Sequence, residues 1–325
     1  MEVVNGLEDI KREPDASLTV GSFDGVHLGH RRILKRMYDY GHRPLTVMIF
    51  DPHPQVVLRS YGDPSPQLTT FEDRKRLFEE LGVDRLIIIR FDAEFAGISA
   101  RDFIDHILLE KVGMSRIFIG PTHGFGSGRR GNADMLAEMA AADGFDVEIV
   151  PPVVRGGRYV SSSRIRKCLQ VGDVRSAMHF LGRPYYIRGE VVPGDGRGQA
   201  LGFPTANLKP GNSSMLMPPP GVYATVTEVD GIRLPSVSHF GDRPTFTDAK
   251  PSIETHILSF EDDIYEKRIS IGLVEMLREI KSFDSPVELS AQIVRDAEDA
   301  KVKLIESGFG PYSWFPGRRF GKIEN

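Results

Sequence analysis

The chain has 325 residues, with 41 lysines and arginines against 45 aspartates and glutamates, which gives a formal net charge of −4. This balance argues against a nucleic-acid-binding protein, which needs a surplus of basic residues. Any phosphate ligand must therefore be held by a few neighbouring residues and not by the overall charge of the protein. The single cysteine, Cys168, excludes an intrachain disulfide and a metal site built from several cysteines. We expect a cytoplasmic protein without membrane or nucleic-acid partners, a monomer or weak homo-oligomer, of two domains.

The first half of the chain alternates short apolar runs with amphipathic segments. The runs typical of buried strands are residues 17–21, 45–50, 85–89, 116–120 and 146–150. Two intervening segments begin with a hydroxyl three residues before a carboxylate, Thr70 before Asp73 and Ser99 before Asp102, which is typical of helix starts. Strands that alternate with helices predict a doubly wound parallel sheet, in which ligands bind beyond the carboxyl ends of the strands.

Beyond Gly182 the pattern changes to half-exposed, alternating strands separated by turn residues. The clearest such runs are residues 185–192, 221–229, 252–260 and 267–277. They indicate a small antiparallel β-barrel. Ser285, Pro286 and Glu288 then form a capping box that starts a C-terminal helix with one apolar stripe. We therefore expect domains of residues 1–183 and 184–325.

A glycine-rich turn, GSFDGVHLGH (21–30), follows the first predicted strand and leads into a helix. His27 and His30 are three residues apart at the helix start, where free backbone N–H groups and the helix dipole favour an anion. Glycines allow the backbone to approach phosphate oxygens closely. The residues expected to contact phosphate are Gly21, Ser22, Phe23, Asp24, Gly25 and Gly29.

This turn resembles the signature of nucleotidylyltransferases, and its FDGVH part is similar to the prokaryotic bifunctional riboflavin kinase/FAD synthetases. The likeness continues through FDPHP (50–54), FAGISARDF (95–103), VSSSRIR (160–166) and LGRPYYIRGEVV (181–192). The resemblance implies a Rossmann-like FMN adenylyltransferase domain followed by a riboflavin kinase barrel. It also implies ATP as co-substrate, Mg²⁺ as cofactor, and riboflavin, FMN and FAD as substrates and products.

In the implied adenylyl transfer the phosphate of FMN attacks the α-phosphorus of ATP. Because this nucleophile is already an anion, no general base is needed, and His27 and His30 are expected to stabilise phosphate oxygens. The residues expected to bind the leaving pyrophosphate are Ser162, Ser163, Arg164 and Arg166. For the two arginines, ordinary solvation on a helix surface is the alternative interpretation.

The segment after the fourth predicted strand, GPTHGFG (120–126), departs from the family. The family has Asp or Asn where this chain has Thr122, and Phe where it has His123. Phe125 is the expected flavin contact in this domain. The departures lead us to expect weaker substrate binding here, with adenylyl transfer retained.

A second glycine-rich segment, residues 194–207, lacks the Gly-Lys-Ser/Thr ending of a Walker loop. It closely resembles the riboflavin kinase pattern whose Pro-Thr-Ala-Asn element binds Mg-ATP. By that resemblance Thr205 and Asn207 hold Mg²⁺, which prefers hard oxygen ligands. The glycines expected to arch over the nucleotide are Gly196, Gly198 and Gly202.

Phosphorylation of the 5′-hydroxyl of riboflavin requires an acceptor for its proton, so we expect a carboxylate near the γ-phosphate. Glu254 is the candidate, because IETH (253–256) resembles the family's Glu-x-His strand. The alternative is an outward-facing glutamate on an alternating strand. Arg278 matches the family arginine near the flavin, and Phe283 is expected to border the ring. At residues 239–241, HFG stands where the family often has Asn-x-Gly.

Two alternatives to a bifunctional enzyme remain open at this point. The chain could be a riboflavin kinase alone, with an N-terminal domain of weak or altered nucleotidylyltransferase activity. It could also be a flavin-sequestering protein with inactive sites. The presence of the candidate catalytic residues argues against the second alternative.

Overall fold

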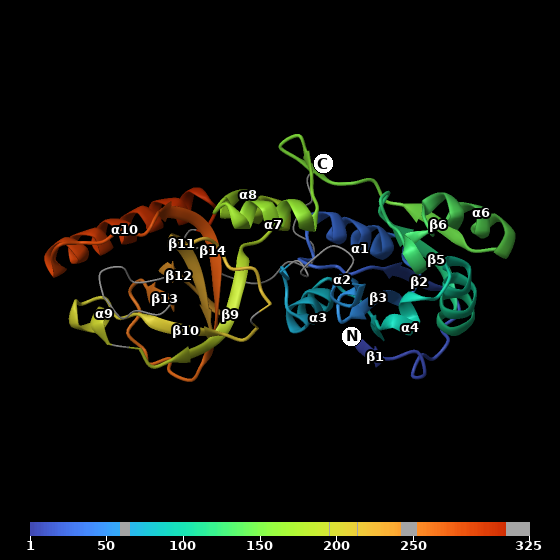
Figure 1. Ribbon diagram of the computed structural model, residues 1–325, viewed down its shortest axis with the longest axis horizontal. Coiled ribbons are helices and arrows are strands. Elements are labelled where there is room, and N and C mark those ends of the chain that lie inside the picture. Colours follow the sequence, from blue (N-terminus) through green and yellow to red (C-terminus); the bar gives the residue numbers. More distant parts are fainter. Residues whose placement is uncertain (59–65, 195, 213, 242–251, 310–325) are drawn as a thin grey trace. The chain divides into compact units, whose positions relative to one another are not determined.

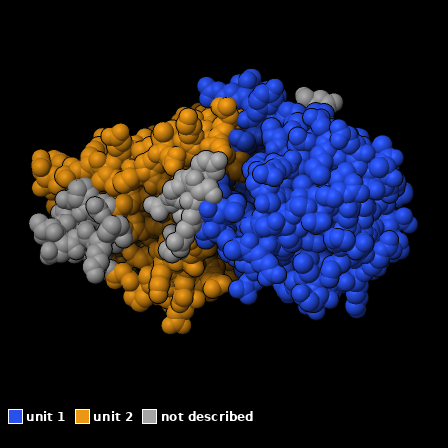
Figure 2. Space-filling model, turned by 45° about the vertical axis from the view of Figure 1, so that its right-hand side comes forward, with its two compact units in different colours: residues 1–161, 318–325 blue, residues 162–317 orange. Residues whose placement is uncertain are grey.

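The computed structural model describes residues 1–58, 66–194, 196–212, 214–241 and 252–309. The chain divides into two compact units, and the break falls between Ser161 and Ser162 (Figures 1 and 2). Within the described residues, no helix combines the length and the apolar character needed to cross a membrane.

Six parallel strands form the sheet of the first unit, in the order β1-β4-β3-β2-β5-β6 (Figure 1). The strands are β1 (Glu2–Asn5), β2 (Ala16–Val20), β3 (Leu45–Asp51), β4 (Arg85–Arg90), β5 (Met114–Ile119) and β6 (Asp146–Ile149). The predicted parallel sheet is confirmed, and β2 to β6 correspond to the runs identified in the sequence. The analysis missed β1, an edge strand that pairs with β4.

Helices cover both faces of this sheet, because successive side chains of a strand point to opposite sides. On β3, Met48 belongs to the core on one face, whereas Val47 and Ile49 belong to the core on the other. The helices of the first core are η1 (Phe103–Val112), a π-helix, and α6 (Ala133–Asp143); those of the second are α1 (Leu28–Tyr40) and α3 (Phe71–Glu80). The short helices are α2 (Pro54–Leu58), α4 (Ala93–Ala96), α5 (Ala100–Asp102) and η2 (Ser127–Arg129).

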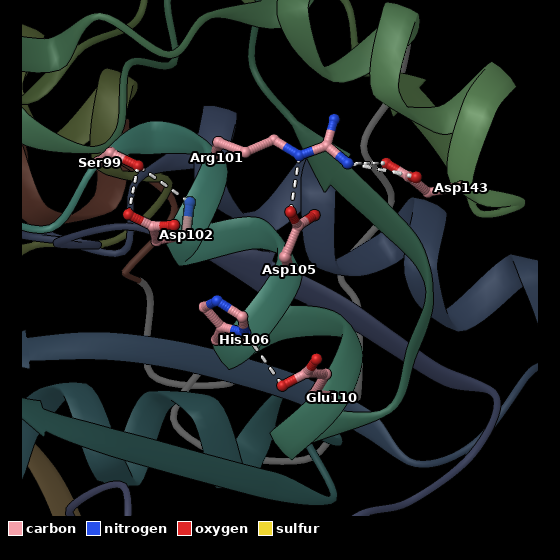
Figure 3. Close-up of polar contacts among 7 residues, drawn as sticks. All are labelled: Ser99, Arg101, Asp102, Asp105, His106, Glu110 and Asp143. Carbon is pink, nitrogen blue, oxygen red and sulfur yellow. Dashed lines mark hydrogen bonds and ion pairs between the residues drawn. The ribbon is translucent and has the colours of Figure 1, made fainter.

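Both predicted helix starts of this unit are present. The hydroxyl of Thr70 accepts a hydrogen bond from the N–H of Asp73 at 3.1 Å, and the hydroxyl of Ser99 accepts one from the N–H of Asp102 at 3.0 Å. At each start the hydroxyl also donates to the aspartate carboxylate, as Figure 3 shows for Ser99. These bonds satisfy N–H groups that a helix start leaves without an intrahelical acceptor.

Arg101 links the two helices on one face of the sheet. Its Nε donates to Asp105 on η1 at 2.6 Å, and its Nη2 donates to Asp143, the last residue of α6 (Figure 3). On the next residue of η1, a hydrogen bond to Glu110 raises the pKa of the exposed His106. Such exposed pairs contribute little to stability, so the apolar core beneath them holds the helices.

The second unit is built on a closed barrel of six antiparallel strands, in the cyclic order β10-β13-β12-β11-β14-β9. The strands are β9 (Tyr185–Val192), β10 (Ala206–Pro210), β11 (Gly221–Val229), β12 (Ile232–Gly241), β13 (Ser252–Ile257) and β14 (Arg268–Arg278). The predicted barrel is confirmed. The sequence analysis did not single out β10 and β12 as strands.

The barrel interior contains a network of fully buried hydroxyl groups. Thr225 contacts Ser236 and Ser238 at 2.8 Å each, Ser238 donates to Thr255 at 2.9 Å, and Thr227 joins Ser236 to Thr255. Because buried polar groups need partners, this network accounts for polar side chains in a closed core. It also establishes which side chains of β11, β12 and β13 point inward, so that their strand neighbours point outward.

Helix α10 (Pro286–Glu306) lies along the outside of the barrel (Figure 1). It begins as predicted, with Ser285 accepting a hydrogen bond from the N–H of Glu288. Its Ala300 and Leu304 pack against a cluster formed by residues of β11 and β14. The remaining elements are the hairpin β7 (Val154–Arg155) and β8 (Arg158–Tyr159), and the helices α7 (Ser162–Gln170), α8 (Val174–Leu181) and α9 (Arg197–Ala200).

Helix α8 also packs on the barrel. Met178 contacts the cluster beneath α10, and Arg175 lies 3.3 Å from the carboxylate of Glu275 on β14. Accordingly α7 and α8 belong to the second compact unit, although they precede the predicted boundary at residues 183 and 184. That boundary stays a prediction about which segments fold independently.

A comparison of two truncated chains tests this arrangement. A fragment that begins at Ser162 should unfold at a higher temperature than one that begins at Pro184, because the shorter fragment exposes the barrel surface under Met178. Burial of one such side chain is worth about 1.5–3 kcal/mol, which corresponds to several degrees in a domain of this size. Thermal unfolding followed by circular dichroism measures the difference. Equal midpoints would show that α8 does not stabilise the barrel.

Candidate active sites

The first site is the loop between β2 and α1, at the carboxyl edge of the parallel sheet (Figure 1). Phe23 and Val26 have φ angles of 50° and 38°, values that aromatic and β-branched residues rarely adopt. Both side chains are buried in the core that α1 and α3 share. Strained backbone of this kind persists only where surrounding contacts hold it, and it is common at functional sites.

Those contacts come from the segment that leads into α3. The buried carboxylate of Asp24 accepts hydrogen bonds from the N–H of Leu68 and from both the N–H and the hydroxyl of Thr69, each at 3.0 Å. The hydroxyl of Thr69 in turn accepts from the N–H of Gly25 at 2.9 Å. We call this set the Asp24–Thr69 latch. Asp24 thus holds the loop in shape, and its predicted contact with phosphate stays a prediction.

A buried cation supports the same loop from beneath. Arg74, on α3, donates from Nη1 to the carbonyl of Ser22 at 2.8 Å and is 3% exposed. Burial lowers the pKa of Arg74, while Asp24 and Asp51 act in the opposite direction. The sequence analysis did not identify this arginine, since a basic residue inside a helix carries no local signal of burial.

His27 and His30 lie together at the start of α1, as predicted. His27 is the N-cap, and its Nδ1 accepts a hydrogen bond from the N–H of His30 at 3.3 Å. Because Nδ1 acts as acceptor, the ring proton of a neutral His27 is on Nε2, which leaves that atom as a donor. The two rings stack with centroids 3.6 Å apart. A Cβ on Gly29 would lie 3.1 Å from the His27 ring, so glycine permits this packing.

The loop after β5 carries the residues that depart from the family. The His123 ring stacks on Phe125 with centroids 5.8 Å apart. Burial, and secondarily the charge of Arg129, lower the pKa of His123 to about 4, so the ring is neutral near pH 7. Thr122 is exposed beside it, and its carbonyl lies 3.5 Å from Nη2 of Arg129.

Phe125, the predicted flavin contact, belongs to a larger aromatic cluster that the sequence analysis did not assemble. Neighbouring ring centroids lie 5.5–6.2 Å apart. The other members, from segments near the carboxyl edge of the sheet, are Phe50, Phe91, Phe95 and Phe103. This edge of the sheet therefore offers aromatic surface as well as the anion-binding helix start.

The predicted pyrophosphate-binding residues all lie in the first turns of α7. They are Ser162, Ser163, Arg164 and Arg166. This helix belongs to the second compact unit, whereas the histidine pair belongs to the first. The joint action of these residues with His27 and His30 stays a prediction.

The second site lies where β10 and β13 pair. Asn207 is directly opposite Glu254 in the register, and the hydroxyl of Thr205 lies 3.5 Å from Oε2 of Glu254. Ser252 donates to Oε1 of the same carboxylate at 2.9 Å. The structure thus brings the three predicted residues together and adds Ser252, which the sequence analysis did not single out.

The glycine-rich segment before β10 packs tightly over these groups. A Cβ on Gly198 would lie 2.5 Å from the carbonyl oxygen of Phe203 and 3.0 Å from the Thr205 hydroxyl, and one on Gly194 would overlap the Asn207 amide. Gly196 and Gly202 have φ angles of 69° and 84°, which glycine adopts without strain. Tight packing therefore accounts for Gly194 and Gly198, and backbone conformation accounts for Gly196 and Gly202.

Arg278 and Phe283, the predicted flavin contacts, lie beside α10. Arg278 forms a bidentate ion pair with the buried Asp296, with Nε to Oδ1 at 2.9 Å and Nη2 to Oδ2 at 2.7 Å. Gln292 donates to Asp296 and accepts from Lys281, and both cations lie near the Phe283 ring, at 5.7 Å for Arg278 and 5.2 Å for Lys281. The contacts hold the arginine and the aromatic ring in fixed positions.

Comparison with known protein families gives two matches along the chain, one over the first site and one over the second. Residues 9–164 match the FAD synthetase family, and residues 181–304 match the riboflavin kinase family. The chain is 34% identical over 309 residues to the bifunctional riboflavin kinase/FMN adenylyltransferase of Escherichia coli, covering 93% of this chain and 97% of that one. The chain belongs to this bifunctional family.

A further relative and a solved structure also resemble the chain over most of its length. The bifunctional enzyme of Bacillus subtilis is 36% identical over 299 residues, covering 90% of this chain and 93% of its own. A crystal structure described as a macrolide-efflux protein from Streptococcus pneumoniae superposes with a TM-score of 0.82 at 28% identity, covering 92% of this chain and 99% of that one. This solved structure therefore matches the fold of the chain over most of its length.

The Asp24–Thr69 latch can be tested with Thr69→Val, which keeps the shape of the side chain and removes its hydroxyl. We expect formation of FAD from supplied FMN to fall about tenfold or more, because a small misplacement of a reacting group is costly. Phosphorylation of riboflavin should remain unchanged. Thr46→Val, at another fully buried threonine of the same unit, is the matched control. Equal effects of the two substitutions would assign the loss to general destabilisation.

The lowered pKa of His123 predicts a pH dependence of stability. The imidazole has a pKa of about 4 in the folded protein against an ordinary value of 6.5, so the unfolded chain binds more protons between these values. Stability contributed by this group is therefore full above pH 6.5 and is lost as the pH falls toward 4. The His123→Gln variant should show a smaller drop in unfolding temperature from pH 7 to pH 5. An identical drop would contradict the assignment.

Proposed function

We propose that the first unit adenylylates FMN to FAD and that the second unit phosphorylates riboflavin to FMN, with ATP as the donor in both reactions. The single observation that carries the proposal is the difference between the sites. The first combines a histidine pair with a helix start, which suits an anionic nucleophile. The second places a carboxylate beside hydroxyl and amide oxygens, which suits a hydroxyl nucleophile.

In the first reaction the residues position anions and neutralise charge. The backbone N–H groups at the start of α1 and Nε2 of His27 donate to phosphate oxygens of ATP, and His30 stacks behind to hold the ring. Glycines 21, 25 and 29 allow the loop to approach the phosphates. Ser162, Ser163, Arg164 and Arg166 bind the pyrophosphate as it leaves. The Phe125 cluster provides the aromatic surface for the flavin ring.

In the second reaction Glu254 accepts the proton of the riboflavin 5′-hydroxyl as that oxygen attacks the γ-phosphate. Thr205 and Asn207 would hold Mg²⁺ together with phosphate oxygens. Their neutral oxygens suit this ion, which keeps several non-protein ligands. Bound there, Mg²⁺ would neutralise charge on the phosphates. Among the described residues no group of three or more His, Cys, Asp or Glu forms an all-protein metal site.

The intact histidine pair favours the bifunctional enzyme over a kinase with an inactive first domain. His27 retains its cap position and its donor atom, and the latch holds the strained loop in place. The departures at Thr122 and His123 lie in the loop after β5, outside the residues proposed to bind phosphate. We therefore expect them to change substrate affinity in the first unit and to leave adenylyl transfer active.

A crossed substitution experiment tests the two assignments. Glu254→Gln should lower riboflavin phosphorylation about a hundredfold or more, because it removes the base and keeps the size of the side chain. The same variant should form FAD from supplied FMN normally. His27→Ala combined with His30→Ala should do the opposite. FMN and FAD are separated and quantified by chromatography after incubation with ATP and Mg²⁺.

The wild-type chain is the internal reference for these assays. Formation of FMN without FAD at saturating substrates would favour the kinase-only alternative. Formation of neither FMN nor FAD would show that neither site is catalytically active. Loss of both activities in one variant would indicate misfolding or a shared site and would contradict the separation proposed here.

A further inference from the structure

A single row of residues crosses five strands of the barrel at the second site. The register pairs Asn207 with Glu254, Glu254 with His239, His239 with Val222, and Val222 with Arg278. Side chains that are directly opposite one another on neighbouring strands lie on the same face and about 5 Å apart. The row therefore begins at the amide beside the glycine-rich segment and ends at the arginine held by α10.

The row lies on the outer face of the barrel. Ser238 and Thr255, the strand neighbours of His239 and Glu254, are fully buried and hydrogen-bond to each other inside it. Because alternate residues of a strand point to opposite faces, His239 and Glu254 point outward. At the end of the row, Arg278 pairs with Asp296 of α10, which packs on that outer face. Five consecutive members therefore share one surface.

The side chains along the row match the successive parts of a riboflavin molecule. Glu254 is the proposed base, Val222 is apolar, and the charges of Arg278 and Lys281 both lie near the Phe283 ring. Three strand spacings separate Glu254 from Arg278, or about 14 Å along the barrel surface. This is comparable to the length of a tricyclic ring with an extended five-carbon side chain. A riboflavin molecule with its terminal hydroxyl at Glu254 would therefore place its ring at Phe283.

The proposed nucleotide site lies on the other side of Glu254 from His239. Asn207 is paired on its far side with Val192 of β9, and the glycine-rich segment that follows β9 folds back over Asn207 and Thr205. Phosphates bound by Thr205 and Asn207 thus lie on the β9 side of Glu254, and His239 lies on the opposite side. The residue next to the base on the flavin side is His239.

We propose that His239 binds the hydroxyl groups of the ribityl chain of riboflavin and so selects flavins that carry this chain. The proposal rests on the proposed kinase function of the second unit. An imidazole offers one donor and one acceptor, which suits a polyol whose hydroxyls can do both. His239 is a substrate-binding residue in this scheme, and it takes no part in proton transfer from the 5′-hydroxyl.

The experiment compares riboflavin with lumiflavin, which has the same ring system and a methyl group in place of the ribityl chain. His239→Ala should raise the KM for riboflavin about fivefold to tenfold, the value of one or two neutral hydrogen bonds. The inhibition constant of lumiflavin against the kinase reaction and the KM for ATP should stay within about twofold of the wild type, since neither ligand reaches His239. His239→Asn, which keeps a donor and an acceptor, should recover most of the affinity.

Arg233→Ala is the matched control, because Arg233 lies on the same strand and the same outer face, away from the row, and should leave every constant unchanged. An unchanged KM for ATP reports that the barrel of each variant is folded. An unchanged KM for riboflavin in both His239 variants would overturn the inference. An equal loss for riboflavin and lumiflavin would also overturn it, by assigning His239 to the ring. A wild-type chain that does not phosphorylate riboflavin would instead contradict the proposed function.

Discussion

Both candidate sites depend on the pairing of strands through backbone hydrogen bonds, which determines which side chains and loops become neighbours. In the first unit, parallel pairing brings the carboxyl ends of β2, β3 and β5 to one edge, where the histidine loop and the aromatic cluster lie. In the second unit, the closed antiparallel ladder aligns residues from five strands in one row. A shift of one residue in any pair would turn its side chains to the other face.

Buried polar contacts then hold these neighbours in a functional geometry. Asp24 is buried with hydrogen bonds from the Thr69 segment, and Asp296 is buried against Arg278 and Gln292. Burial of a charge is costly, so such groups add less to net stability than an apolar replacement of the same shape could. They add direction, because a carboxylate accepts hydrogen bonds only from donors placed around it. In both units an aspartate of this kind positions a residue or loop proposed to contact substrate.

Close approach of backbone and side chain is the second requirement of the two sites. The ring of His27 lies over Gly29, and the Asn207 amide and the Thr205 hydroxyl lie against Gly194 and Gly198. A side chain at any of these glycines would displace a group that the proposed reactions use. The glycine-rich segments therefore serve the positions of specific neighbouring groups, and general flexibility is not needed to explain them.

The sequence by itself determined the local features of this protein. Alternating and periodic apolar residues predicted the sheet, the barrel and α10, and the hydroxyl–carboxylate pairs at Thr70 and Ser99 predicted helix starts, because these signals act over a few residues. The strand β1 and the polar residues Gln292 and Asp296 on the buried side of α10 gave no such signal. Only the tertiary structure decided that His239 lies beside Glu254 and that Asp24 fastens to Thr69. These contacts join residues 15 and 45 positions apart, and long-range pairing is set by the register and packing of whole elements.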